Sequence, residues 1–123
     1  MTDPIDFEES HVGDVAVLSV TGTIDLMTEA ALRTQINRLI STHPPALVVD
    51  LSGLDFLASV GLAVLIETRN EVGDAFAVVA DGPATSRPIR LTQLDQTLNL
   101  APTLDAAVAA MAPTTGGVDG ANR

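Results

Sequence analysis

The class of fold is set by residues 47–65, which read LVVDLSGLDFLASVGLAVL. The apolar run at 46–51 does not alternate with polar residues, so it predicts a strand that is covered on both faces. Residues 52–58 are expected to form a connection, because Ser, Gly and Asp interrupt the run. The next segment is apolar at 62–66 and polar at 67–71, and Gly73 follows as a natural C-terminal stop. This pattern predicts a helix from Ser59 to about Glu71.

The chain after this stretch continues to alternate strands and helices. We expect a buried strand at 75–80, a helix that Ser86 can cap, a very short strand at 98–100 and an amphipathic helix from Leu104 to Met111. In the helix at Ser86, Pro88 lies in the first turn, where a missing N–H is tolerated. Leu91 and Leu94 are expected to face inward.

The chain before this stretch predicts a hairpin and one helix. Residues 15–20 form a β-branched run of strand length, residues 5–8 suggest a short edge strand, and a turn at 11–14 joins them. The helix shows an apolar spacing of i, i+4, i+7 and i+8 at Leu32, Ile36, Leu39 and Ile40. Thr28 is its expected N-cap, and the prolines at 44–45 stop it.

The predicted order of elements is therefore ββαβαβαβα, with the short strand near residue 99 included. Strands that alternate with helices indicate an α/β fold with a mostly parallel sheet, and the first hairpin makes the sheet mixed. We expect a single domain over residues 1–112, with four or five strands and about four helices. Residues 113–123 are rich in Gly and Thr and are expected to form a disordered tail.

Composition excludes several classes of partner. The chain has 123 residues and a net charge of −10, and its positive side chains are all arginines. Nucleic acids and anionic membranes need clustered cations, so neither is an expected partner. The acidity favours a basic protein partner, or it serves only to keep the protein soluble.

The absence of cysteine excludes disulfides, thiolate catalysis and cysteine-based metal sites. It fits a reducing cytoplasm, which is the expected location. The acidic N-terminal residues do not resemble a signal peptide, and no stretch approaches the roughly 20 apolar residues of a membrane span.

Catalytic and metal-binding motifs are missing from the sequence. A P-loop needs a lysine that the chain does not have, and His11 and His43 lack the spacing of metal ligands. Ser59 lacks the first glycine of a hydrolase nucleophile elbow. Asp25, Asp50 and Asp55 could converge as carboxylates, but aspartates near strand ends and loops commonly form local hydrogen bonds instead. We therefore expect no enzyme, no catalytic residues, no metal and no cofactor; a hydrolase that uses Ser59 is the weakest hypothesis.

Two separated motifs resemble the signature of STAS domains, and specifically of bacterial anti-sigma factor antagonists. The first is the stretch at 47–65, in which an apolar strand ends in Asp-Leu-Ser and Ala-Ser-Val-Gly-Leu opens a helix. The second is Thr21-Gly22-Thr23-Ile24-Asp25, which is similar to the family's Gly-Glu-Leu-Asp loop. The helical stretch that begins at Arg87 also fits, so that the resemblance spans roughly residues 5–111.

The resemblance implies a regulatory cycle centred on Ser59. In the family this serine accepts a phosphate from the partner anti-sigma factor, which is a Ser/Thr kinase. The unphosphorylated antagonist binds the anti-sigma factor and thereby releases the sigma factor. Phosphorylation breaks that complex, and a separate Ser/Thr phosphatase restores binding.

The motif departs from the common family pattern on both sides of Ser59. Ala58 replaces an aspartate and Val60 replaces a serine or threonine, so that two hydrogen-bonding side chains are lost. This change motivates an alternative hypothesis, in which the domain senses a nucleotide or a small apolar ligand and signals to another protein.

The expected partner interface combines the start of the Ser59 helix with the preceding loop. Ser59, Ala63 and Glu67 share one helical stripe with Asn70. A phosphate in the first helical turn would meet unpaired backbone N–H groups and the positive end of the helix dipole. The full set of expected interface residues is Thr23, Asp25, Leu26, Met27, Leu57, Ala58, Ser59, Val60, Gly61, Ala63 and Glu67.

Two of these residues, Ser59 and Asp25, also have a simpler structural interpretation. Ser59 alone could be the N-cap of its helix, and Asp25 could only shape its loop or cap the helix that follows. Gly61 is expected to permit a tight first turn beside the docking face. The sequence leaves these interpretations open beside the functional ones.

Overall fold

The computed structural model describes residues 5–111, and the predicted tail at 113–123 lies outside them. The boundary of the domain at residue 112 therefore stays a prediction. The elements are, in chain order, β1 (Ile5–Val12), β2 (Val15–Ile24), α1 (Glu29–Ile40), β3 (Ala46–Leu57), α2 (Ser59–Val72), β4 (Phe76–Val79), α3 (Ser86–Leu91), β5 (Leu100–Ala101) and α4 (Leu104–Met111). This order confirms the predicted fold class.

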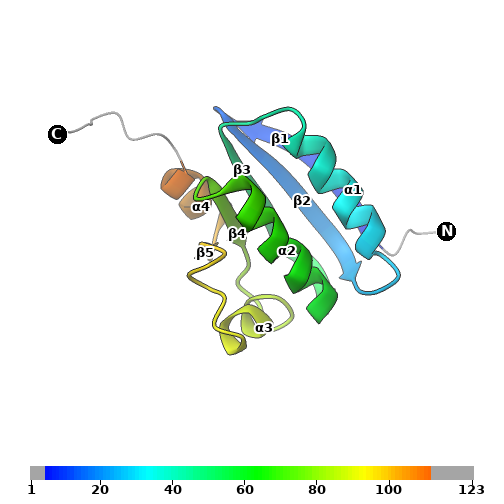
Figure 1. The fold of residues 1–123 in the computed structure, drawn as a ribbon. Helices are drawn as coiled ribbons and strands as arrows, with labels where there is room; N and C mark the ends of the chain where they lie inside the picture. The colour runs from blue at the N-terminus through cyan, green and yellow to red at the C-terminus, as the bar shows by residue number, and fades with distance from the viewer. Residues whose placement is uncertain (1–4, 112–123) are drawn as a thin grey trace.

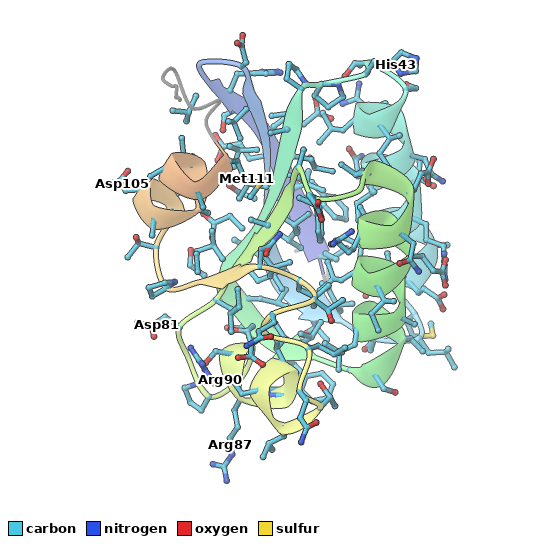
Figure 2. All side chains as sticks on the ribbon, turned by 60° about the vertical axis from the view of Figure 1, so that its left-hand side comes forward. His43, Asp81, Arg87, Arg90, Asp105 and Met111 are labelled. Carbon is cyan, nitrogen blue, oxygen red and sulfur yellow. The ribbon has the colours of Figure 1, made fainter. Side chains whose placement is uncertain are left out.

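The strands form one five-stranded sheet in the order β1-β2-β3-β4-β5. β1 pairs with β2 antiparallel, and the remaining pairs are parallel. In Figure 1, α1 and α2 lie side by side on one face of the sheet, whereas Figure 2 shows α4 on the opposite face. The sheet is therefore covered on both faces, as the unbroken apolar runs of β3 and β4 predict.

Two apolar clusters fill the spaces above and below the sheet. The larger lies under α1 and α2 and includes Leu18, Leu32, Leu47 and Leu65. The smaller lies under α4 and includes Val17, Val48 and Ala107. Aliphatic side chains dominate both clusters, and Phe76 is the only aromatic residue among the fully buried ones.

Three strands are longer than the sequence indicated. β1, which was expected over residues 5–8, continues to Val12. β3 continues through the expected connection at 52–58 and ends at Leu57, and β2 continues to Ile24. The polar residues between them are accommodated by two irregularities in the β2–β3 register, between Ser19 and Thr21 and between Gly22 and Thr23. Such bulges add residues to one strand without ending it. The extension carries β2 and β3 to the first turn of α2.

The expectation that Leu91 faces inward is wrong, because its side chain is 72% exposed. α3 has only six residues, and its single fully buried side chain is Ile89. The chain then turns sharply at Gln93, where φ is 61°, and Leu94 packs partly against the larger cluster instead. Leu91 therefore ends α3 on the outer side.

Candidate functional site

The start of α2 is fixed by a backbone link to the end of β2. The Ala58 N–H donates a hydrogen bond of 2.9 Å to the carbonyl of Ile24, and the Gly61 N–H donates one of 2.9 Å to the carbonyl of Ala58. The first link joins two segments more than thirty residues apart in sequence. The two predicted contact regions, the loop after β2 and the first turn of α2, are therefore neighbours.

Gly61 allows this close approach for a reason that the sequence did not reveal. A Cβ at this position would lie 2.6 Å from Ile24 Cγ2 and 2.6 Å from Leu57 Cδ1. Contacts this short would force the surrounding side chains to move. Gly61 is buried, so it acts by allowing tight packing under the helix and does not contribute a side chain to the surface.

Ser59 is exposed and is the first residue of α2. The N-cap is Ala58, whose methyl group cannot accept a hydrogen bond, so the alternative interpretation of Ser59 as the N-cap is wrong, whereas the predicted helix start at Ser59 is confirmed. Among the described residues, the Ser59 hydroxyl forms no hydrogen bond, and the first turn of α2 carries no acidic side chain. The N–H groups that begin a helix need partners from outside it. Within the described range, the start of α2 therefore has no side chain that caps its N–H groups.

The loop between β2 and α1 is held by its own hydrogen bonds. Oδ1 of Asp25 accepts from the N–H groups of Met27 and Thr28, at 2.9 and 3.2 Å. The buried Thr28 hydroxyl donates to the carbonyl of Thr23 at 2.8 Å and accepts from the Asp25 N–H at 2.9 Å. Asp25 thus shapes the loop, and the loop presents Leu26 and Met27, which are 75% and 89% exposed.

Phe56, near the end of β3, is also exposed, although the sequence did not predict it. It pairs with Thr23 in the β2–β3 register and is 53% exposed. Its neighbour Leu57 is only 4% exposed, so Leu57 lies beneath the surface on which it was expected. The available signal was the spacing of Leu54 and Leu57, which point into the core and leave Phe56 outside. The chain thus carries three large exposed apolar side chains at the ends of β2 and β3.

The predicted stripe of α2 is exposed along its length, from Ser59 through Ala63 and Glu67 to Asn70. Arg33 of α1 donates to both carboxylate oxygens of Glu67, with the longer bond at 3.2 Å. These hydrogen bonds lower the pKa of the Glu67 carboxyl. Glu67 therefore ties α2 to α1 in addition to lying on the outer surface.

The remaining interface candidates are partly covered. Ala58 and Val60 are half-buried beside Ser59, and Thr23 and Asp25 are half-buried in the loop. They border the exposed side chains and shape the surface between them.

A cavity of about 200 Å³ lies at the other end of the helices. It is lined by Ile40, His43, Pro44, Glu71 and Val72. Ligand pockets usually measure about 300–1,000 Å³, so this one is small. Its lining includes a glutamate and no arginine, which disfavours the phosphates of a nucleotide.

The described residues contain neither a cluster of metal ligands nor a membrane-spanning helix. Within residues 5–111, no group of three His, Asp or Glu side chains could hold a metal ion. No helix in the same range has the length and apolar character needed to cross a bilayer. The Asp50 carboxylate accepts a hydrogen bond from the Ser52 N–H at 2.9 Å, in keeping with the local role expected of it.

The chain belongs to the STAS domain family, whose family model matches residues 6–107. It is similar to the anti-sigma-F factor antagonist RsfB of Mycobacterium tuberculosis, with 49% identity over 96 residues. The aligned part covers 76% of this chain and 79% of RsfB. The same identity and coverage are found for RsfB from a second strain of that organism.

Solved structures agree with this assignment. The crystal structure of an anti-sigma factor antagonist from Mycobacterium paratuberculosis matches with a TM-score of 0.84 and 46% identity, over 90% of this chain and 98% of that one. The anti-sigma factor antagonist SpoIIAA in its unphosphorylated form matches with a TM-score of 0.65 over 85% of this chain and 95% of its own. At 15% identity, the second match concerns the fold alone.

Proposed function

We propose that this protein is an anti-sigma factor antagonist that binds an anti-sigma factor through the surface around Ser59. The binding releases the sigma factor, and phosphorylation of Ser59 by the anti-sigma factor, acting as a Ser/Thr kinase, ends it. A Ser/Thr phosphatase then restores the binding form. The protein acts by association in the cytoplasm and is not itself an enzyme.

One observation carries this proposal: Ser59 presents a free hydroxyl at an uncapped helix start, beside exposed apolar side chains. A kinase can reach the hydroxyl because it is exposed and forms no hydrogen bond with a described residue. Leu26, Met27 and Phe56 are exposed apolar side chains, and aromatic residues and methionine are enriched in the cores of protein interfaces. The similarity to anti-sigma factor antagonists supports the choice of partner.

A phosphate on Ser59 would act on the complex more than on the fold. It adds about −1.5 to −2 charges and three acceptor oxygens. In the free protein the unpaired N–H groups of α2 can donate hydrogen bonds to the phosphate oxygens, and the helix dipole favours the negative charge there. In the complex the same charge would have to be removed from water among apolar side chains, which is unfavourable. A loss of about 1.4 kcal/mol already weakens binding tenfold.

The test has two stages. The tagged chain is used to capture partners from a cell extract, mass spectrometry identifies the anti-sigma factor, and the captured complex is incubated with ATP to find the phosphorylated residue. Affinity of the purified anti-sigma factor is then measured by calorimetry for the wild type and for Ser59→Glu, which we expect to bind at least about tenfold more weakly.

Ser10→Glu is the matched control, because Ser10 is an exposed serine near the opposite end of β2. It adds the same charge and should leave the affinity within about twofold. Equal affinities for Ser59→Glu and the wild type would contradict the switch. Phosphate on any residue other than Ser59 would contradict the assignment of the acceptor.

The ligand-sensing alternative has less support in the structure. The small cavity beside His43 is the site it would use, and its size and its glutamate fit a nucleotide poorly. A thermal-shift screen with nucleotides and small apolar compounds tests it. Stabilisation that is lost in His43→Ala would favour this alternative over the proposed function.

A further inference from the structure

The outer side of α3 carries an unusual combination of charge and exposed apolar surface. Arg87, Arg90 and Leu91 are spaced i, i+3 and i+4, which places them on one face of the helix. Both arginines are exposed, and Leu91 is 72% exposed. Ile89 is fully buried on the inner side. We call these three exposed residues the α3 patch.

The two arginines of the patch differ from the other described arginines. Arg33, Arg38 and Arg69 each form an ion pair with a carboxylate. Arg87 and Arg90 form no ion pair with any residue in the range 5–111, although the chain has 16 acidic residues. α3 itself contains no acidic side chain. The patch is therefore a local positive surface on a chain whose net charge is −10.

The patch is held in a defined place despite the shortness of α3. The Ser86 N–H and hydroxyl both donate to the carbonyl of Gly82, each at 2.8 Å. Ile89 anchors the middle of the helix in the larger apolar cluster. The Thr92 hydroxyl donates to the carbonyl of Pro88 at 2.8 Å after the last helical residue. The arginine side chains thus extend from a fixed base.

The patch lies at the same end of the sheet as Ser59. α2 follows β3 and α3 follows β4, and these neighbouring strands are parallel, so both helices start at the carboxyl edge of the sheet. Figure 2 shows Arg87 and Arg90 pointing outward at this end, with His43 at the opposite end. Figure 1 likewise places α3 and the first turn of α2 at one end of the molecule.

We propose that the α3 patch is a second docking surface for the anti-sigma factor, and that it binds an acidic segment carrying an apolar side chain. This proposal rests on the proposed function and adds a second contact to it. The chemistry of the patch indicates the partner. Two arginines without ion pairs attract carboxylates, and the exposed Leu91 favours contact with an apolar side chain. A second copy of this chain is a poorer occupant, since two chains of charge −10 repel each other.

The experiment uses the anti-sigma factor identified by capture with the wild-type chain. Association and dissociation rates are measured for the wild type, for Arg90→Glu and for the double change Arg87→Glu with Arg90→Glu, at low and at high salt. We expect the double variant to bind about tenfold more weakly at low salt, mainly through slower association, and the difference to shrink at high salt. Leu91→Ser should raise the dissociation rate at both salt concentrations.

Arg38→Glu is the control for Arg90→Glu. Arg38 is an exposed arginine in the last turn of α1, and its reversal changes the net charge equally. It should bind as the wild type does. Equal rates for the wild type and the double variant would overturn the α3 patch while leaving the proposed function intact. If the wild-type chain captures no anti-sigma factor, the proposed function itself fails, and the two failures are thereby distinguished.

Discussion

Two helices begin at the same edge of the sheet, and the segments that lead into them differ in their hydrogen bonds. Before α1, the carboxylate of Asp25 accepts from the N–H groups of Met27 and Thr28. The hydroxyl of Thr28 accepts from the Asp25 N–H and donates to the carbonyl of Thr23. Glu29 then places a negative charge in the first turn. Before α2, Ala58 offers no side-chain acceptor, and the first turn has no acidic residue.

The difference shows that α2 is positioned without the groups that normally begin a helix. Its start is held by the Ala58–Ile24 backbone link and by the close packing of Gly61. Neither helix has a side-chain cap hydrogen bond, but the polar side chains before α1 are bonded within their loop, whereas the Ser59 hydroxyl forms no hydrogen bond with a described residue. Four changes test this contrast, from the largest expected effect to the smallest.

Gly61→Val should have the largest effect, because it places bulk where even a Cβ lies 2.6 Å from Ile24 and Leu57. We expect a loss of about 3 kcal/mol in the free energy of unfolding, measured by urea denaturation. Gly82→Val is the control, since nothing lies within 4 Å of a Cβ there. Similar losses for the two variants would show that packing at Gly61 does not position α2.

Thr28→Val should have the next largest effect, because it removes the hydroxyl that joins Thr23 to Asp25. The carbonyl of Thr23 would lose this buried partner, so we expect a loss of about 2 kcal/mol in the same measurement. Thr34→Val removes an exposed hydroxyl from α1 and should change the stability by less than about 0.5 kcal/mol. A Thr28→Val variant as stable as the wild type would mean that the loop is not held by this hydroxyl.

Ala58→Ser should stabilise the protein by supplying the cap that α2 lacks. The backbone of Ala58 is extended, with φ −83° and ψ 168°, as an N-cap requires. We expect a gain of about 1 kcal/mol in the free energy of unfolding. Ala63→Ser, in the exposed middle of α2, should give no gain. If the two variants behave alike, then the N–H groups of α2 are already satisfied.

Glu67→Gln should have the smallest effect and should be visible in the dependence of stability on pH. Arg33 lowers the pKa of Glu67 in the folded state, so its contribution is present above the pKa of the unfolded chain and is lost as the pH falls through the folded pKa. The wild type should therefore lose slightly more stability than the variant as the solution is acidified through the range of glutamate titration. Identical acid profiles would show that the exposed ion pair contributes nothing.

The order of the helices and strands and the buried face of α1 were predictable from the sequence, because they depend on local patterns. Ser59 was correctly predicted to begin α2, since an apolar strand and an apolar helix meet there. Leu32, Ile36 and Leu39 are buried as their spacing predicted. Each of these inferences uses residues close together in the chain, where periodicity is informative.

The errors arose where distant segments decide the outcome. Gly53 and Asp55 look like turn residues, but pairing with β2 keeps them in a strand with bulges. The exposure of Phe56 follows from that extended pairing, and the exposure of Leu91 follows from the early end of α3. The role of Gly61 depends on Ile24, which lies more than thirty residues earlier in the chain. No local pattern contains this information.

The backbone link between Ile24 and Ala58 has a consequence for the thermodynamics of recognition. It fixes the loop that carries Leu26 and Met27 relative to the first turn of α2, so the two parts of the proposed interface are held together before a partner binds. Little conformational entropy then has to be lost on association, and such preorganised surfaces retain more of their contact energy as affinity. In the proposed complex with an anti-sigma factor, this preorganisation would favour tight binding over a small area, and one added charge at Ser59 would weaken it.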